Sequence, residues 1–304
     1  MALDQRIGFL ASLGFSSQPA PEVAKTLREL GYNAVEWTMA HFHPRAHTAA
    51  QRKETVEATA DAGLAISELV VQQDYVCLDE AVREDRIALS IEAVEACGEA
   101  GIPAVNLFTG PAPWDRDAPR IPDDISEGAA WDMAFEAFGR VVPVLERCKV
   151  YGAVEGVFGF LCNDYYTMRV LLDHFNSPWL GVNFDPSHDV LKGNFDTNWI
   201  VAQWGKNRIH HVHLKDAAGI PELGRFVFPM LGEGRVDWPG MFSALEEIGY
   251  EGYCSVEFES FDYHANVLGG DTREAARRAL ADARALMSRR QRRGAATPPP
   301  ERRR

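Results

Sequence analysis

Carboxylate and imidazole side chains recur in the second half of the chain, each near the end of a short apolar segment. The segments read AVEG (153–156), GVNFDPSH (181–188), RIHHVHLKD (208–216) and YCSVEFES (253–260). Carboxylate oxygens combined with an imidazole nitrogen suit Mn2+, Mg2+, Co2+ or Zn2+ rather than a thiophilic metal. The candidate ligands are Glu155, Asp185, His188, His211, His213, Glu257 and Glu259.

A group of buried carboxylates is costly by itself, because like charges and desolvation both raise the pKa of each carboxyl. A bound divalent cation offsets that cost, so the joint pattern predicts a metal site. Each residue also has a structural interpretation; Asp185, for example, precedes a proline and could start a turn. Because strand residues two apart share a face, spacing does not choose between His211 and His213, or between Glu257 and Glu259.

The elements that must position these residues repeat one pattern, in which a helical segment ends at glycine and a short apolar strand follows. The pattern occurs in 23–37, 56–70, 94–108 and 241–259. Glycine suits the position after a helix because it adopts the left-handed conformation without a Cβ clash. Alternation of this kind predicts parallel strands joined by crossover helices.

Eight parallel strands within about 260 residues fit a closed barrel, so we predict a single (β/α)8 TIM barrel over residues 1–288. An open doubly wound sheet is the alternative, but no GxGxxG follows the first strand. In a barrel the carboxyl ends of all strands meet at one face, which would bring the candidate ligands together. The predicted strands are 7–11, 34–38, 65–71, 103–108, 151–156, 179–185, 208–213 and 253–258.

The net charge of −13 is unevenly distributed along the chain. Residues 289–304 hold seven Arg and one Glu, and subtracting this +6 leaves −19 on residues 1–288. An acidic body repels nucleic-acid phosphates, so we expect no nucleic-acid partner. The Arg- and Pro-rich segment 289–304 cannot build a core, and we expect it to be disordered.

Targeting signals are not evident. The apolar runs stop well short of the about 18 residues of a membrane span, and the N-terminal residues do not read as a secretion signal. Five cysteines are scattered without CxxC pairs, which is typical of reduced thiols. We therefore expect a cytoplasmic protein with no membrane partner.

The strand-end motifs resemble those of the xylose isomerase-like TIM barrel superfamily of sugar isomerases and epimerases. The similar stretches are GVNFDPSH (181–188), IHHVHLKD (209–216) and GEGRVDWPGMFSALEEIGYEGYCSVEFE (232–259), the last joining a GxGxVDW loop to a helix and the final strand. The superfamily includes the endonuclease IV group, whose multi-zinc cluster needs further His and Asp ligands. Strands 65–71 and 103–108 end without His, so DNA repair is not expected.

The resemblance implies a particular ligand set. It assigns the metal to Glu155, Asp185, His213 and Glu257, and it places His188 on the substrate. It implies one divalent ion, for which Mn2+ is our first expectation and Mg2+, Co2+ or Zn2+ the alternatives. The family has an Asn or His shortly after the first Glu, whereas this chain reads Glu155-Gly-Val-Phe-Gly, so its substrate contacts differ there.

The implied activity is that of a metal-dependent isomerase or epimerase of a keto- or aldo-sugar, or of a polyol ketone. Glu155 or Glu257 would abstract an α-proton from the substrate and produce an enediolate. Further candidates for binding substrate hydroxyls are Glu36, His41, His43, Lys215 and Arg225. The expected partners are a small carbohydrate substrate and either a second copy of the chain or a small partner subunit.

Two other functions stay open. The same enolate chemistry on a 3-oxo-glycoside would expel a group by β-elimination, as in a C-glycoside deglycosidase, and an inosose dehydratase is a close variant. The third function is a non-catalytic sugar-binding or structural barrel. Aromatic residues that could line an aryl site are Trp37, Phe108, Trp114, Phe158, Phe160 and Tyr165.

The loops after the strands would set substrate specificity. They include 72–80, 109–128 and 217–231, whose sequences match no pattern of known specificity. The Pro-rich stretch 109–124 is long enough to act as a lid or as a subunit contact.

Overall fold

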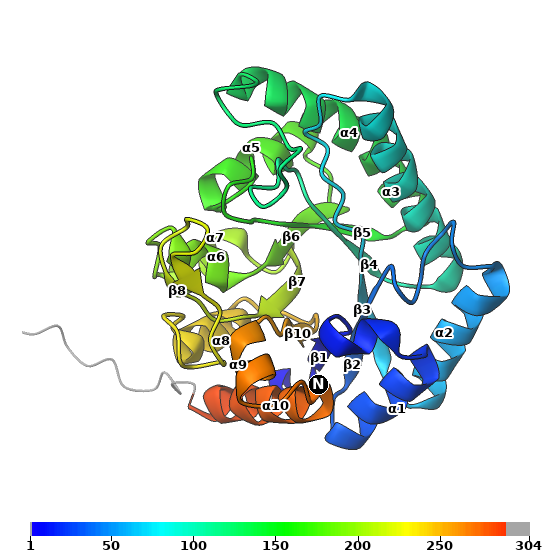
Figure 1. Cartoon of the computed structure of the whole chain (residues 1–304), viewed down its shortest axis with the longest axis vertical. Helices are drawn as coiled ribbons and strands as arrows, with labels where there is room; N and C mark the ends of the chain where they lie inside the picture. Colours follow the sequence, from blue (N-terminus) through cyan, green and yellow to red (C-terminus); the bar gives the residue numbers. More distant parts are fainter. Residues whose placement is uncertain (1, 290–304) are drawn as a thin grey trace, which may run out of the picture.

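Eight parallel strands close into a barrel in the computed structural model, which describes residues 2–289. Their order around the barrel is β1-β10-β7-β6-β5-β4-β3-β2, and β2 pairs back to β1 (Figure 1). The predicted (β/α)8 barrel is therefore confirmed. The strands are β1 (Ile7–Leu10), β2 (Ala34–Thr38), β3 (Ala65–Val70), β4 (Ala104–Leu107), β5 (Tyr151–Glu155), β6 (Leu180–Phe184), β7 (Ile209–Leu214) and β10 (Cys254–Val256).

Each predicted strand lies within two residues of the observed one at both ends. The boundaries were predictable because the apolar runs are short and are separated by glycine-terminated helices. Gly31 and Gly101 close two of these helices in the left-handed conformation, with φ of 100° and 73°. The predicted Arg-rich tail, 289–304, lies outside the described residues except for Arg289.

Helices surround the strands and cover the outside of the barrel (Figure 1). Side-chain caps begin many of them; Thr48, for example, accepts from the backbone N–H of Gln51, and Asp79 accepts from that of Val82. The longer helices are α1 (Ala20–Leu30), α2 (Ala49–Asp61), α3 (Glu80–Ala100), α4 (Glu127–Cys148), α5 (Tyr165–Phe175), α7 (Thr197–Trp204), α8 (Trp238–Glu247) and α10 (Thr272–Ser288). Short elements are η1 (Leu3–Gln5), η2 (Leu13–Ser17), α6 (Pro186–Leu191) and α9 (Phe261–Asn266).

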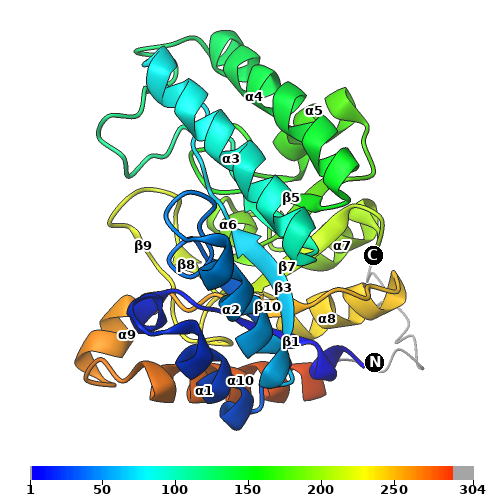
Figure 2. The same ribbon diagram turned by 90° about the vertical axis from the view of Figure 1, so that its right-hand side faces the viewer.

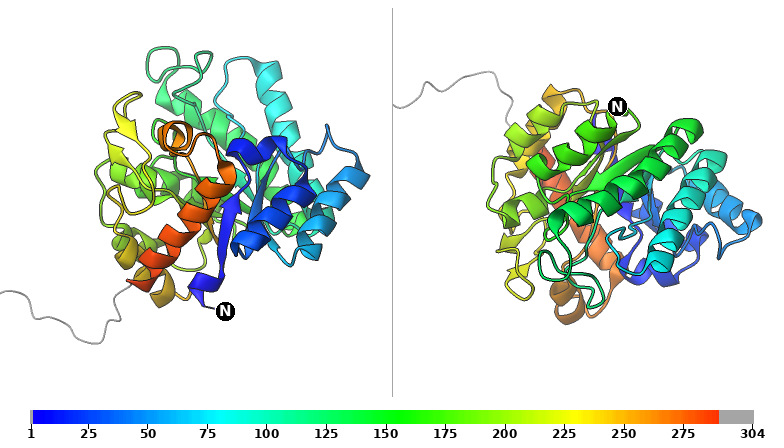
Figure 3. Two further views of the ribbon diagram at one scale, coloured as in Figure 1. Left: turned by 60° about the horizontal axis from the view of Figure 1, so that its bottom comes forward. Right: turned by 90° about the horizontal axis from the view of Figure 1, so that it is seen from above.

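The C-terminal helix α10 packs between α1 and α8 and completes the ring (Figure 3). The buried Tyr32 hydroxyl donates to the backbone carbonyl of Ala276, at 2.8 Å, and ties the start of the chain to this last helix. Among the described residues, no helix is long and apolar enough to cross a membrane.

The carboxyl ends of the strands open toward one side of the molecule. In Figure 2 the loop between β4 and α4, the segment that carries β8 (Ala218–Gly219) and β9 (Phe226–Val227), and helix α9 all project from that side. β8 and β9 form an antiparallel hairpin within the predicted loop 217–231. This hairpin was not predicted, because strands of two residues have no periodicity to detect.

Polar side chains occupy the barrel interior, where aliphatic side chains are usual. All of them are almost completely buried, so each needs a partner within the protein or a bound group. They are Glu36, Glu68, Asn106, Glu155, Asn183, His211, His213 and Ser255.

A candidate metal centre at the strand ends

Three carboxylates and one imidazole converge at the carboxyl ends of β5, β6, β7 and β10. One ligand atom from each of Glu155, Asp185, His213 and Glu257 lies within 4.8 Å of all the others. His213 Nδ1 is 3.0 Å from Glu257 Oε2 and 3.5 Å from Glu155 Oε1. All four residues are buried, with at most 8% of their surface exposed. The structure thus brings together the four residues predicted as metal ligands.

The two carboxylate oxygens of Asp185 have different contacts, one with the backbone and one with side chains of the site. Its Oδ1 accepts from the backbone N–H of Ser187, at 2.8 Å, and so caps helix α6. Its Oδ2 lies 2.9 Å from Lys215 Nζ and 3.4 Å from His188 Nε2. The turn predicted from the following proline and the predicted ligand role therefore both fit this residue.

His213 is held from behind by Glu36, a carboxylate of β2. His213 Nε2 lies 3.0 Å from Glu36 Oε1, which leaves Nδ1 facing the carboxylates of the site. His211 lies two residues deeper in the barrel and bonds to Glu36 Oε2 and Ser255 Oγ, both at 3.0 Å. Burial by itself would raise the pKa of Glu36, but His213 and His211 lower it well below its usual value.

Lys215 introduces a cation into this group of acids. Its Nζ lies 2.7 Å from Glu257, 2.9 Å from Asp185 and 3.2 Å from Glu259. Burial would lower the pKa of Lys215, but Asp185, Glu257 and Glu259 raise it well above its usual value. The carboxylates therefore create a point of negative potential deep in the protein that favours a bound positive charge.

His188 lies beside this cation and stays neutral. Burial, with a smaller contribution from Lys215, lowers the pKa of His188 to about 4. Its Nε2 is 3.4 Å from Lys215 Nζ, so the neutral ring can accept a hydrogen bond from the ammonium. An imidazole at this position can therefore exchange hydrogen bonds with a substrate oxygen.

A second buried group of acids lies below the candidate metal centre. Glu68 is fully buried, and neither of its oxygens has a hydrogen-bond partner. Burial and the neighbouring Glu36 raise the pKa of Glu68 well above its usual value, which favours the neutral form of this carboxyl. Asn106 lies between Glu68 and the candidate metal centre. It donates to Glu155 Oε2 at 2.9 Å and fixes the orientation of that carboxylate.

A pocket of about 200 Å3 opens above the carboxylates. Its acidic end consists of the charged and imidazole side chains Glu155, His188, Lys215, Glu257 and Glu259. The rest of its lining is mainly apolar and comes from the loops after β4, β5 and β7, together with Gln72 after β3. The apolar lining residues are Phe108, Trp114, Val157, Phe158, Leu223, Phe226 and Phe228.

Some predicted substrate contacts lie elsewhere. His41 is buried, with its Nε2 3.1 Å from the backbone carbonyls of Phe15 and Gln18, so its contacts hold the loop after β2. Arg225 is on the hairpin, where its exposed guanidinium pairs with Glu222 at 2.6 Å. Glu36 lies beneath His213, as described above, and none of the three lines the pocket.

Three of the predicted aromatic residues line the pocket and three do not. Phe160 packs against Phe108, with the centres of the two rings 4.9 Å apart. Trp37 is fully buried and donates to Thr59 Oγ1, at 3.1 Å. Tyr165 begins α5 and packs against Trp204.

Asp216 explains the GxGxVDW motif, which sequence reasoning left without a structural role. Its buried carboxylate accepts from the backbone N–H groups of Ala217, Gly232, Gly234 and Val236, at 2.9–3.1 Å, and from Trp238 Nε1 at 2.9 Å. A Cβ on Gly234 would lie only 2.1 Å from Asp216 Oδ1, so this position requires glycine. The motif thus anchors the returning end of the hairpin segment next to Lys215.

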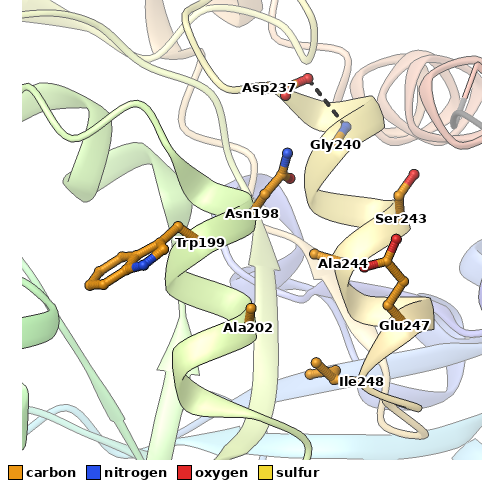
Figure 4. Close-up of a pocket in the computed structure, with 9 residues that line it drawn as sticks. All are labelled: Asn198, Trp199, Ala202, Asp237, Gly240, Ser243, Ala244, Glu247 and Ile248. Carbon is orange, nitrogen blue, oxygen red and sulfur yellow. Dashed lines mark hydrogen bonds between the residues drawn. The ribbon is translucent and has the colours of Figure 1, made fainter. Parts of the chain in front are cut away.

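A separate cleft lies on the outer surface between α7 and α8. Figure 4 shows its lining, with Trp199 and Ala202 on α7 and with Ser243, Ala244 and Ile248 on or just after α8; the Trp199 ring points away from α8. The cleft contains no histidine, and its acidic side chains come from α8 or its cap. It lies on the outside of the barrel and takes no part in the site described above.

The fold and the site together define a barrel protein with an acidic, metal-competent centre at the carboxyl ends of its strands. Residues 24–288 match the family model described as "Xylose isomerase-like TIM barrel". The chain belongs to this family, as its strand-end motifs predicted.

Among curated proteins, the chain is 25% identical over 247 residues to SgbU of Escherichia coli strain K12, covering 78% of this chain and 82% of the relative. The assignment of that protein as an L-ribulose-5-phosphate 3-epimerase is provisional.

Among solved structures, 3-keto-D-glucoside 4-epimerase (YcjR) from E. coli aligns with a TM-score of 0.71 at 17% identity, covering 92% of this chain and 99% of that one. D-Psicose 3-epimerase from Clostridium cellulolyticum H10, solved with D-tagatose, aligns with a TM-score of 0.74 at 17% identity, covering 92% and 99%. IOLI protein, solved with a bound zinc atom, aligns with a TM-score of 0.73 at 16% identity, covering 94% and 99%. These identities support the fold, and the chain is related to sugar epimerases and isomerases.

Proposed function

We propose that this protein is a divalent-metal-dependent isomerase or epimerase that moves an α-proton on a keto- or aldo-sugar, or on a polyol ketone. The observation that carries the proposal is the convergence of Glu155, Asp185, His213 and Glu257 within 4.8 Å in a buried site. Sugar epimerases among the relatives support the same class of reaction.

The four residues fit a divalent ion by their chemistry. Three carboxylates and one imidazole form an oxygen-rich donor set that suits Mn2+, Mg2+, Co2+ or Zn2+. Mn2+ is the ion we propose first, and the zinc in IOLI protein shows that a relative of this fold binds a metal. When bound, the ion supplies Lewis acidity that polarises a substrate carbonyl and stabilises the charge of an enediolate.

The acid and base roles follow from where Glu155 and Glu257 originate. Glu155 ends β5 and Glu257 follows β10, and β6 and β7 separate these strands in the barrel order. Their carboxylates therefore approach the centre from different sides of the barrel. One carboxylate can remove the α-proton from one face of a substrate, and the other can return a proton to the opposite face, which inverts the carbon.

His188 and Lys215 complete the arrangement at the substrate side. His188 is neutral and can bond to a substrate hydroxyl or carbonyl oxygen through Nε2. Lys215 is already close to Glu257 and Glu259, so it can orient those carboxylates and compensate for their charge.

Solvent exchange tests the proposal directly. The metal-loaded enzyme is incubated in D2O with D-fructose, D-psicose, D-tagatose and D-ribulose, and proton NMR follows the α-hydrogens. We expect deuterium at an α-carbon of at least one sugar, loss of this exchange with EDTA, and a drop of at least about 100-fold for Glu257→Gln with the fold intact. Equal exchange rates for Glu257→Gln and the unmodified protein would refute the assigned role of that carboxylate.

One observation favours a second candidate, a lyase that acts by β-elimination on a 3-oxo-glycoside. Lys215 Nζ lies 2.7 Å from Glu257, so a proton donor is adjacent to the proposed base. In the elimination Glu257 would take the α-proton, the β carbon–oxygen bond would break, and the ammonium would protonate the departing oxygen. Release of a free phenol from an aryl 3-oxo-glycoside, with no epimer formed, distinguishes this candidate.

A further inference from the structure

The pocket above the carboxylates has a wall of aromatic rings delivered by three separate segments. We define the aromatic wall as Trp114, from the loop after β4, Phe158, from the loop after β5, and Phe226 and Phe228, from the hairpin segment. Phe158 is the centre of the wall, with its ring 4.9 Å from Phe226 and 6.2 Å from Trp114. Phe226 and Phe228 are 5.1 Å apart.

The aromatic wall reaches down to the reacting end of the pocket. The His188 ring lies 5.8 Å from Phe158 and 6.0 Å from Phe228, and Lys215 Nζ lies 4.9 Å from the centre of the Phe228 ring. At the outer end, 51% of the Trp114 surface is exposed. A large aromatic side chain exposed at a pocket mouth offers a flat surface for a ligand to cover.

The wall offers few partners for hydroxyl groups. Apart from the acidic end, Gln72 is the one amide or hydroxyl side chain among the pocket residues that the structure describes. A buried sugar hydroxyl without a hydrogen-bond partner is costly, whereas an apolar ring on these side chains gains burial. The wall therefore fits a substrate segment that carries no hydroxyls.

The charges of the pocket disfavour a phosphate group. Lys215 is the single lysine or arginine that lines the described pocket, and three carboxylates already surround it. Arg225 is on the outside of the hairpin and pairs with Glu222. Apart from the proposed metal ion at the carboxylates, a phosphate monoester entering here would meet Glu155, Glu257 and Glu259 without a lysine or arginine free to pair with it.

The space available fits a substituent on a sugar. The pocket of about 200 Å3 shares Phe226, Phe228 and Glu259 with an adjoining groove of about 510 Å3. The groove adds Phe261 and Tyr263 as further aromatic lining. The groove therefore adds aromatic surface beside the pocket for a flat group that extends from a sugar at the acidic end.

We propose that the substrate is an unphosphorylated sugar derivative with a flat apolar substituent of the aryl type, and that the aromatic wall binds this substituent. The inference rests on the proposed function for the position of the sugar. It departs from the phosphorylated sugar named for the relative SgbU, because the one lysine of the described pocket is already paired with carboxylates and no arginine lines it.

Calorimetric titration of the metal-loaded protein tests this proposal independently of turnover. The probes are 4-nitrophenyl β-D-glucopyranoside, methyl β-D-glucopyranoside and D-glucose 6-phosphate. We expect the aryl glycoside to bind at least about tenfold tighter than the methyl glycoside, because one aromatic ring is buried on the wall. We expect the phosphate to bind more weakly than the aryl glycoside.

Variants locate the effect on the wall. Trp114→Ala and Phe226→Ala should each remove most of the aryl preference and leave binding of the methyl glycoside unchanged. Trp114 is half exposed, so its removal leaves the core intact. The matched control is Trp199→Ala, which removes a tryptophan with 40% of its surface exposed in the outer cleft of Figure 4 and should change none of the affinities.

Three outcomes overturn the proposal: no measurable binding of the aryl glycoside, equal affinities for the aryl and methyl glycosides, or tighter binding of the phosphate. These outcomes are distinct from a failure of the proposed function. Deuterium exchange on a ketose without any aryl preference would reject the aryl site and keep the function. An aryl preference that depends on Trp114, without exchange on any sugar, would keep the aryl site and reject the proposed function.

Discussion

At the scale of single residues, the site depends on which nitrogen of His213 faces the carboxylates. Glu36 lies 3.0 Å from His213 Nε2 and holds a proton there, so Nδ1, which faces Glu155 and Glu257, is the nitrogen that would bind a metal. The partner of a metal-binding histidine sets the tautomer and the ring orientation. Glu36 was predicted as a substrate contact, and its position in the structure gives it this supporting role instead.

Replacement of Glu36 should weaken metal binding without removing a ligand. Glu36→Gln loses the charge that holds the His213 tautomer, and we expect an about 10- to 100-fold loss of Mn2+ affinity. Competition titration with a chelating dye measures this affinity in the absence of substrate. The control is Glu57→Gln, an exposed carboxylate on α2. Unchanged Mn2+ affinity in Glu36→Gln would contradict the supporting role.

Sequence reasoning found the four candidate ligands for a physical reason. Parallel strands must present their carboxyl ends at one face, so polar residues at the ends of consecutive strands had to meet. Spacing could not separate His211 from His213, because both point into the barrel and only depth distinguishes them. The burial of Lys215 among three carboxylates depends on how β7 and β10 align, which no local pattern encodes.

At the scale of elements, the hairpin segment is held by one carboxylate. Asp216 accepts hydrogen bonds from four backbone N–H groups and from the Trp238 indole, and all of these donors except Ala217 come from the stretch that returns from the hairpin to α8. The hairpin in turn carries Phe226 and, just after it, Phe228 of the aromatic wall. Its position was not predictable, because the GxGxVDW motif gives no indication of which distant acceptor its N–H groups reach.

Loss of Asp216 should therefore destabilise the protein strongly. Asp216→Ala leaves several buried donors without an acceptor, and we expect a loss of about 3 kcal/mol or more in the free energy of unfolding. Urea denaturation followed by circular dichroism measures it. Asp262→Ala removes an acidic residue on α9 that has an exposed position and serves as the control. An unchanged denaturation midpoint for Asp216→Ala would show that the anchor contributes little.

At the scale of the whole molecule, some titratable groups are buried outside the barrel interior, away from the candidate metal centre. One is His210 on the outer face of β7, whose ring lies 4.4 Å from that of Tyr151 on β5. The two rings meet across β6 at Gly181, where a Cβ would lie 2.5 Å from the His210 ring. Burial, with Arg208 contributing further, lowers the pKa of His210 to about 4.

This shift makes stability depend on pH in a definite direction. The unfolded chain binds a proton at His210 below about pH 6.5, whereas the folded protein does so only near pH 4. The stability is therefore complete above pH 6.5 and is lost as the pH falls toward 4, by up to about 3 kcal/mol. Unfolding free energies of the unmodified protein and of His210→Phe, measured by urea denaturation at both ends of this range, should differ in their pH dependence by that amount. An identical pH dependence would contradict the assignment.

The global architecture was the most predictable level. Four helix–glycine–strand repeats and the other short apolar runs predict eight strands, and this number favours closure into a barrel. The aromatic wall was only partly predictable, because Phe158 and Trp114 were among the candidate residues while Phe226 and Phe228 were not. Side chains on long loops gather according to how the loops fold, and the sequence alone does not determine that arrangement.

Metal stoichiometry tests the central claim most directly, since the proposed chemistry and the proposed role of the buried acids both depend on one ion. Mass spectrometry of the purified, Mn2+-equilibrated protein should find about one divalent ion per chain. Asp185→Asn combined with His213→Ala should bind none and stay folded. A well-folded, metal-free protein whose sugar α-proton exchange is unaffected by EDTA would contradict the account.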